Sequence, residues 1–189
     1  MMQKSTQKLF SLLLCIAAPT LASAVPTDPR DANPVEVGSA LPQAQLTSPD
    51  GNLLSLHEVA GSQKSILIFY RGAWCPYCTK HLAAVGQYEQ AILDKGYQII
   101  AISPDQPEQA ANYADEAEFN YSIYSDPDRS TIKAFGIAFE TINRRTQTAE
   151  IRPVPAIYIT DSEGRITFRH FDANYKERLS PEELMNALN

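Results

Sequence analysis

The stretch that decides the fold is SILIFYRGAWCPYC, residues 65–78. It opens with a nearly continuous apolar run from Ser65 to Tyr70, which is typical of a strand buried on both faces of a sheet. Cys75 and Cys78 follow at C-x-x-C spacing, with Pro76 directly after the first cysteine. Because proline favours the first position of a helix, we expect a helix to begin there. The stretch therefore predicts a buried strand that carries two thiols to the start of a helix.

Beyond this stretch, the sequence predicts a second strand parallel to the first. Apolar residues recur at helical spacing from Pro76 to Lys95, namely Leu82, Val85, Tyr88 and Ile92. Gly96 stands where a C-terminal helix cap is expected. Residues 98–102 form the next apolar run, and the order strand, helix, strand indicates a right-handed crossover in a parallel sheet.

The remaining segments complete an α/β pattern. The sequence predicts an N-terminal hairpin over 44–56 around Asp50-Gly51, a helix over 106–118, a strand over 122–124 and a helix ending at Phe135. Residues 137–152 indicate a loop or a ragged hairpin, and their role stays open. Strand runs over 156–160 and 165–170 predict an antiparallel pair, and Ser180, Pro181 and Glu183 predict a capped final helix to Leu188.

The N-terminus has the pattern of a secretory signal peptide. Lys4 and Lys8 precede an apolar run over 9–21, and Ala22-Ser23-Ala24 has the small-x-small pattern of a cleavage site. The run is shorter than the roughly 18–20 residues that span a bilayer, which disfavours a retained membrane anchor. Lipidation at Cys15 is disfavoured because the preceding Leu14 is bulky. We therefore predict an exported, periplasmic protein.

Three parts of the chain are predicted: a signal peptide (1–24), an extended proline-containing leader (25–38) and one domain (39–189). Without the signal peptide 165 residues remain, enough for one full hydrophobic core. They carry 14 basic and 22 acidic residues, a net charge of about −8. This charge disfavours nucleic acid and anionic membrane as partners, so we expect no stable membrane insertion.

The cysteine count indicates redox chemistry. Once Cys15 leaves with the signal peptide, the chain keeps only Cys75 and Cys78. Where disulfides persist, such a lone pair is expected to cycle between dithiol and disulfide. A static bridge between near neighbours closes a very small ring and stabilises little. Zinc needs about four ligands, and the histidines show no metal spacing with the pair. We predict no metal and no cofactor.

Cys75 is the predicted nucleophile. At the start of a helix, unpaired backbone N–H groups and the helix dipole stabilise its thiolate. The pKa of such a cysteine falls to roughly 3.5–7.5, from about 8.5 for a free thiol. Cys78 lies in the same turn and is placed to attack a mixed disulfide or a sulfenic acid on Cys75. Pro76 and Tyr77 tune the pair, and Trp74 shields it or provides a binding surface.

Several segments resemble a known family. Residues 69–78, FYRGAWCPYC, resemble the active-site strand and turn of the thioredoxin superfamily. The segments IAISPD (100–105) and SDPD (125–128) are similar to the peroxiredoxin branch known as AhpC/TSA. The tail from Pro153 to Gly164, with Asp172, Tyr175, Arg178 and Pro181, resembles a peroxiredoxin-like subgroup that carries W-C-P-Y-C. The resemblance extends over 37–188 and implies a thioredoxin-like fold with a central mixed sheet flanked by helices; its members often form homodimers.

The resemblance also implies roles for single residues. Pro155 is expected to be a cis-proline that faces the cysteines, and the Val154 backbone to pair with a bound disulfide substrate. Gly72 departs from the family, because peroxiredoxins usually carry a threonine or serine three residues before the reactive cysteine. Arg71 is the candidate replacement for their peroxide-polarising arginine. Phe69 stands where many thioredoxins bury an acid, so proton handling falls to water, Glu140 or another group.

Three functions remain open. The first is a peroxidase, in which Cys75 reduces a small hydroperoxide, Cys78 closes a disulfide and a thioredoxin-type donor reduces it. The second is a thiol-disulfide oxidoreductase acting on protein disulfides. The third is a non-catalytic binding module of the same fold. The AhpC/TSA-like body favours the first, and the W-C-P-Y-C spacing with Gly72 favours the second.

Other conspicuous residues have structural interpretations. We expect His81 to lie at the surface, and Asp126 and Asp128 to cap a helix. Arg144 and Arg145 are expected in a solvated loop. The set Asp172, Tyr175 and Arg178 is expected to brace the last helix, with a role near the active site left open.

Overall fold

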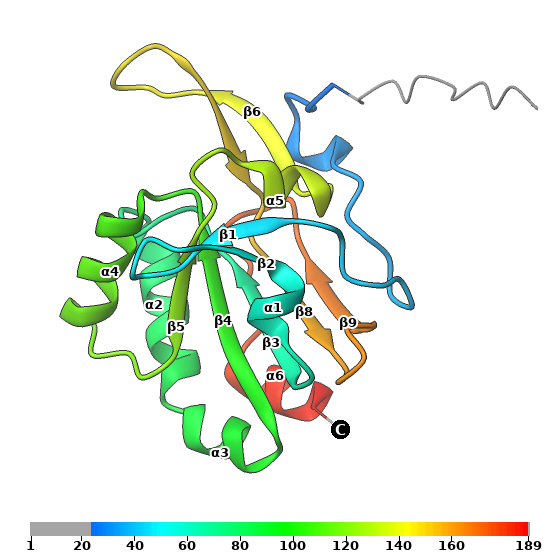
Figure 1. The fold of residues 1–189 in the computed structure, drawn as a ribbon. Coiled ribbons are helices and arrows are strands. Elements are labelled where there is room, and N and C mark those ends of the chain that lie inside the picture. Colours follow the sequence, from blue (N-terminus) through cyan, green and yellow to red (C-terminus); the bar gives the residue numbers. More distant parts are fainter. Residues whose placement is uncertain (1–23, 189) are drawn as a thin grey trace, which may run out of the picture.

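The computed structural model describes residues 24–188, which form a sheet with helices on both faces (Figure 1). The predicted signal peptide lies, apart from its last residue, outside the described residues. The strands of the main sheet are β1 (Gln45–Thr47), β2 (Leu53–Ser55), β3 (Lys64–Phe69), β4 (Tyr97–Ser103), β5 (Ser122–Ser125), β8 (Ala156–Thr160) and β9 (Ile166–Phe171). The helices are α1 (Leu56–Ala60), α2 (Pro76–Gly86), α3 (Glu89–Asp94), α4 (Pro107–Glu116), α5 (Ser130–Ala134) and α6 (Pro181–Ala187).

The seven-stranded sheet has the order β2-β1-β5-β4-β3-β8-β9. The buried strand β3 lies between β4, to which it is parallel, and β8, to which it is antiparallel. β4 and β5 are parallel, so the predicted mixed sheet with a parallel centre is confirmed. The N-terminal hairpin is confirmed as well: β1 and β2 are antiparallel, and Gly51 in their turn has a φ of +82°.

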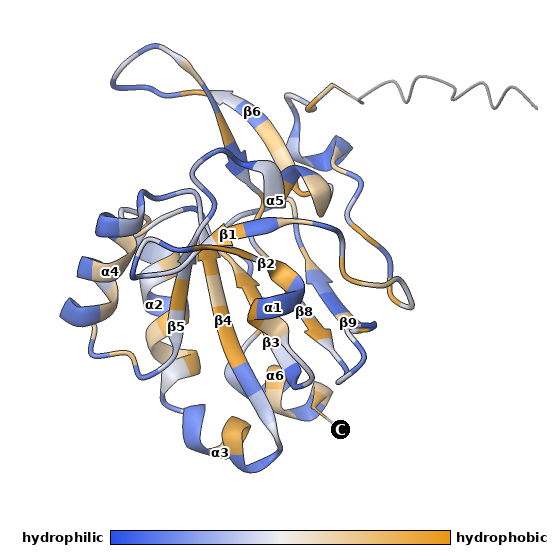
Figure 2. Cartoon of the chain, viewed as in Figure 1, coloured by the Kyte–Doolittle hydropathy of each residue, from blue (hydrophilic) through white to orange (hydrophobic). Residues whose placement is uncertain are grey.

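Alternate residues of β3 serve two cores. Ile66 and Ile68, together with Tyr70 just after the strand, face the core that contains residues of α2, α3, α4 and α6. Leu67 and Phe69 face the opposite core, with residues of α1 and α5. Figure 2 shows the apolar central strands β3, β4 and β5 between helices with hydrophilic outer faces. A fully buried aliphatic side chain contributes about 1.5–3 kcal/mol, so this alternation fixes the register of the strand that precedes the cysteines.

The helix predicted from Pro76 to Lys95 is divided in two, which corrects the sequence-based prediction. α2 ends at Gly86 and α3 begins at Glu89. Gly86 is the last residue of α2, and glycine disfavours helix by roughly 1 kcal/mol relative to alanine. Tyr88 then has φ −101° and ψ 3°, outside the helical range. Gly96 follows α3 with φ +80°, as expected of a cap.

Residues 138–153 form a hairpin separate from the main sheet, one of the two forms predicted for this region. Its strands are β6 (Ala138–Ile142) and β7 (Ala149–Pro153). In Figure 1 the hairpin projects from one end of the domain. Arg144 and Arg145 are exposed in its turn, as predicted.

The leader lies along the domain, with one 3₁₀ turn at Pro29–Asp31. The Pro26 carbonyl accepts a hydrogen bond from the Glu140 backbone N–H of β6 at 2.8 Å, and Val35 N–H donates to the Phe135 carbonyl at 3.0 Å. The Arg169 side chain of β9 donates to the Pro34 carbonyl at 2.8 Å. The leader is therefore held by both the hairpin and the main sheet.

The predicted helix caps are confirmed. Ser180 and Glu183 form a capping box at α6. At α5 the fully buried Asp126 carboxylate accepts the backbone N–H groups of Thr131 and Ile132 at 3.0 and 2.9 Å. Asp128 accepts the Ser130 N–H at 3.0 Å. Between residues 24 and 188, no helix has the length and apolar character that a membrane crossing requires.

The Asp126 cap gives a stability prediction. Asp126→Ala should lower the free energy of unfolding by about 1–2 kcal/mol, because two buried N–H groups lose their acceptor. Urea unfolding followed by fluorescence measures the change. Asp128→Ala, which removes an exposed cap of the same helix, is the matched control and should cost less. If both variants lose the same free energy of unfolding, burial of the Asp126 carboxylate does not strengthen its cap, and the prediction is wrong.

Candidate active site

The strand β3 and the helix α2 place both cysteines at one turn. Cys75 is the residue before α2, with extended φ −93° and ψ 106°, and its carbonyl accepts the N–H groups of Cys78 and Thr79 at 2.9 and 3.0 Å. Neither cysteine is in a disulfide, and both are about 1% exposed. The Cys78 thiol donates to the Cys75 sulfur, and the two sulfur atoms are 2.7 Å apart. The turn therefore brings the two sulfurs into direct contact.

The contact divides the charge unequally between the sulfurs. The hydrogen bond from the Cys78 thiol is the largest influence that lowers the pKa of Cys75, which falls to about 6 although burial opposes the change. The Cys78 backbone N–H and the charges of Arg71 and Arg178 lower it further. The same hydrogen bond, together with burial, raises the pKa of Cys78. At neutral pH Cys75 is the thiolate and Cys78 keeps its proton.

An aromatic and cationic rim surrounds this turn. Trp74 is 54% exposed, and the Arg71 guanidinium carbon lies 4.9 Å from its ring centre and 4.2 Å from that of Tyr175. Arg152 of β7 lies 4.5 Å from the Trp74 ring centre. Tyr77 meets Tyr175 edge to face at 5.8 Å. The structure brings together the predicted Arg71, Trp74 and Tyr77, and it adds Arg152, which no pattern in the sequence had indicated.

Gly72 is required by the loop between β3 and Cys75. Its φ is +132°, and a Cβ there would lie 2.5 Å from Trp74 Nε1 and 2.7 Å from Asp105 Oδ1. The Asp105 carboxylate accepts the Ala73 N–H at 2.8 Å and the Ser103 hydroxyl at 3.0 Å. Burial raises the pKa of Asp105. The departure from the family's hydroxyl residue therefore has a steric cause: Trp74 and Asp105 occupy the space of a side chain.

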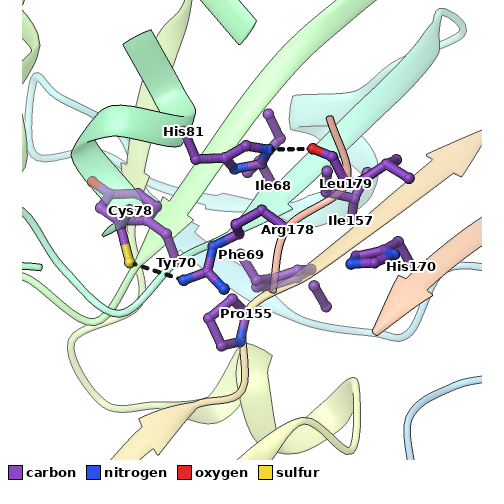
Figure 3. Close-up of a pocket in the computed structure, with 11 residues that line it drawn as sticks. Ile68, Phe69, Tyr70, Cys78, His81, Pro155, Ile157, His170, Arg178 and Leu179 are labelled. Carbon is purple, nitrogen blue, oxygen red and sulfur yellow. Dashed lines mark hydrogen bonds between the residues drawn. The ribbon is translucent and has the colours of Figure 1, made fainter. Parts of the chain in front are cut away.

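A small cavity of about 10 Å³ lies behind Cys78, and Figure 3 shows its walls. His81 was expected at the surface, and this is wrong. Its ring lines the cavity, and because burial lowers its pKa to about 4, the neutral ring donates from Nε2 to the Leu179 carbonyl at 3.0 Å. Arg178 reaches across the cavity, with Nη2 3.6 Å from the Cys78 sulfur. The segment after β9 thus contributes to the site.

The structure differs from the prediction at Val154 and Pro155. Pro155 lines the cavity behind Cys78, but no peptide bond within residues 24–188 is cis, so the expected cis-proline is wrong. An X–Pro bond is trans unless its surroundings select the other form. Val154 is 1% exposed, and its N–H donates to the Ile137 carbonyl at 2.8 Å. That N–H is already paired and does not offer itself to a bound disulfide.

One further candidate, Glu140, stays outside the site. Glu140 is exposed on β6 and is not part of the cavity behind Cys78. Among residues 24–188, no three His, Cys, Asp or Glu side chains gather as a metal site.

A model of the AhpC/TSA family matches residues 37–169, which includes the cysteine turn and the sheet around it. The chain belongs to the AhpC/TSA family. It is a thiol oxidoreductase of peroxiredoxin type with the thioredoxin-like fold.

Individual curated proteins and solved structures are similar to this chain. Peroxiredoxin Bcp of Escherichia coli is 28% identical over 105 residues, which are 56% of this chain and 67% of Bcp. The thiol-disulfide oxidoreductase ResA of Bacillus thuringiensis is 21% identical over 150 residues, 79% of this chain and 78% of ResA. The structure of reduced Prx3 of Vibrio vulnificus with hydrogen peroxide matches with a TM-score of 0.73 at 22% identity, over 82% of this chain and 99% of Prx3.

The shared proton in this AhpC/TSA turn gives a titration prediction. Alkylation of Cys75 should follow a pKa of about 6, since the thiolate is present above that pH and is lost as the pH falls through it. Cys78→Ala removes the donor and should raise this pKa. The pH dependence of the iodoacetamide reaction measures both forms. An unchanged titration in Cys78→Ala would show that the Cys78 thiol does not stabilise the Cys75 thiolate.

Proposed function

We propose that this protein reduces hydroperoxides, with Cys75 as the attacking thiolate and Cys78 as the thiol that closes a disulfide. The observation that carries the proposal is the 2.7 Å contact between the sulfurs. It stabilises the Cys75 thiolate before the reaction and keeps a protonated thiol beside it for the next step.

The reaction proceeds in three balanced steps. The Cys75 thiolate attacks the terminal oxygen of the hydroperoxide, the O–O bond breaks, and an alkoxide leaves and takes a proton from water. Cys75 is then a sulfenic acid. Cys78 attacks its sulfur, the S–S bond forms, and the displaced hydroxide leaves as water with the proton of Cys78. A thioredoxin-type dithiol finally reduces the disulfide and is itself oxidised.

Arg71 is the residue best placed to bind the peroxide. Its Nε is a buried donor with no hydrogen-bond partner, and its charge lowers the pKa of Cys75. Beside it lies a cavity of about 210 Å³, walled by Arg71, Val154, Pro155 and Tyr175 and by residues of the leader and β6. This cavity offers room for the organic group of a hydroperoxide. Alkyl peroxide reduction is the activity studied in structures of a structural relative, the Xanthomonas campestris bacterioferritin comigratory protein.

Thiol-disulfide exchange with another protein is the second candidate. The exposed Trp74 and Tyr77 and the similarity to ResA favour it. The paired N–H of Val154 argues against it, because a protein substrate that adds as a strand needs free backbone groups at this position. A binding module without turnover has no use for the negative charge held on Cys75.

Light scattering tests whether the protein also forms the homodimer suggested by its family.

The deciding experiment compares two oxidants of the reduced protein. Peroxide should oxidise Cys75 far faster than free cysteine at the same pH, followed by stopped-flow fluorescence of Trp74. Arg71→Gln should slow this step roughly 10- to 100-fold, since a hydrogen bond to a charged group contributes about 1.5–3 kcal/mol. Arg144→Gln removes the same charge from the exposed hairpin turn and is the control. A wild-type rate equal to that of free cysteine, with rapid reduction of a protein disulfide, would assign the second function instead.

We also propose that the protein is exported to the periplasm. The charged and apolar pattern of residues 1–24 and the lone dithiol support this. Cell fractionation and N-terminal sequencing should find the protein in the periplasm with its sequence starting near Val25. A cytoplasmic protein that keeps residues 1–24 would refute the proposal.

A further inference from the structure

Arg178 is held in place through the residue that follows it in the chain. It follows β9 in a segment where the Asp172 carboxylate accepts the Asn174 N–H at 2.7 Å. The next residue, Leu179, is buried, and its carbonyl accepts the His81 ring N–H at 3.0 Å. His81 belongs to α2, the helix that carries Cys78. The histidine therefore fixes the Arg178 segment to the helix of the resolving cysteine.

The Arg178 guanidinium is aimed at the Cys78 sulfur. Nη1 donates to the Glu177 carbonyl at 2.8 Å, which orients the planar group, and Nη2 lies 3.6 Å from the sulfur (Figure 3). The ion pairs of residues 24–188 involve Arg30, Arg152 and Arg169 and leave the half-buried Arg178 without a carboxylate. Its positive charge is therefore available to a thiolate at Cys78.

The other groups around Cys78 do not supply this charge. Tyr70 of the strand end and Tyr113 of α4 are phenols, and burial raises the pKa of both. His81 and His170 line the same cavity, and burial lowers the pKa of both, so they are neutral at physiological pH. Arg71 acts on Cys78 through its backbone, whereas Arg178 acts through its charge.

The state of Cys75 decides when the charge of Arg178 matters. While Cys75 is a thiolate, its hydrogen bond with Cys78 is the largest influence that keeps the proton on Cys78. Oxidation of Cys75 to a neutral sulfenic acid removes that negative charge. Arg178 then faces Cys78 with no anion competing beside it.

We propose that Arg178 is a catalytic residue of disulfide closure, whose guanidinium holds the Cys78 sulfur as the attacking thiolate. The inference rests on the proposed function and deepens it, because it assigns a residue to the second chemical step. Cys78 loses its proton, its sulfur attacks the Cys75 sulfur, the S–S bond forms and the S–O bond breaks. The hydroxide that leaves combines with the proton to give water. Arg178 pairs with the thiolate that exists before the attack and is unchanged afterwards.

The first test measures the Cys78 thiolate without any peroxide. In a Cys75→Ser background, which removes the competing anion, Arg178→Gln should raise the pKa of Cys78 by about 1. At a pH below both pKa values, this makes the thiolate fraction of Cys78 roughly 10-fold smaller. Arg178→Lys keeps a positive charge and should restore part of the lost thiolate fraction. Lys176→Gln is the matched control, because Lys176 lies two residues away over the Tyr77 ring. The pH dependence of alkylation gives the values.

The second test isolates the closure step. The Cys75 thiolate is first converted to a mixed disulfide with a chromogenic aromatic disulfide, and the release of the second aromatic thiol by Cys78 is followed. Arg178→Gln should slow this release about 10-fold at neutral pH, whereas Lys176→Gln should not. Because no peroxide is used, the assay decides the role of Arg178 even if peroxide reduction fails in the wild type.

The result that would overturn the inference is an unchanged Cys78 pKa together with an unchanged release rate in Arg178→Gln. A variant that does not fold is recognised by thermal unfolding, and Arg178→Lys then decides the question. If folded Arg178→Lys shows the same Cys78 pKa and the same slow release of aromatic thiol as His81→Ala, which loosens the segment, the charge at position 178 has no effect. The segment then has only a structural role and the proposal fails.

Discussion

One proton shared between two sulfur atoms organises this site. The Cys78 thiol donates to the Cys75 sulfur, so negative charge resides on the first sulfur and the proton on the second. Both sulfurs are shielded from water, and a hydrogen bond to an anion is stronger in such surroundings than at the surface. The rest of the structure keeps these two atoms at contact distance and keeps positive charge close to both of them.

The surrounding scaffold meets this constraint through the register of β3 and the loop after it. The two cores fix β3 from both faces, and Gly72 lets the chain turn where Trp74 and Asp105 leave no space for a side chain. Asp105 then holds the Ala73 N–H, so the loop before Cys75 is anchored to the end of β4. The positive charges come from three separate segments, since Arg71 follows β3, Arg152 lies on β7 and Arg178 follows β9.

The sequence predicted most of what depends on local patterns. Three features were predicted from short stretches of sequence and are present in the structure: the apolar run of β3, the Asp50-Gly51 hairpin and the Ser180 capping box. Each of them depends on neighbouring residues alone. The break after Gly86 was missed because the apolar residues keep helical spacing on both sides of it, from Leu82 and Val85 to Tyr88 and Ile92. His81 and Val154 were misassigned because their partners, the Leu179 and Ile137 carbonyls, are distant in the sequence. Arg152 joins the site through the ring of Trp74, a contact that no spacing in the sequence encodes.

The way the leader is held has a practical consequence for protein engineering. A boundary drawn at residue 39 would suit the sequence pattern, yet it would remove the carbonyls that occupy the N–H of Glu140 and the guanidinium of Arg169. It would also strip Pro29 from the wall of the cavity beside Arg71. An expression fragment that starts at residue 39 would thus lose part of the wall of this cavity, and a fusion tag belongs at the other terminus.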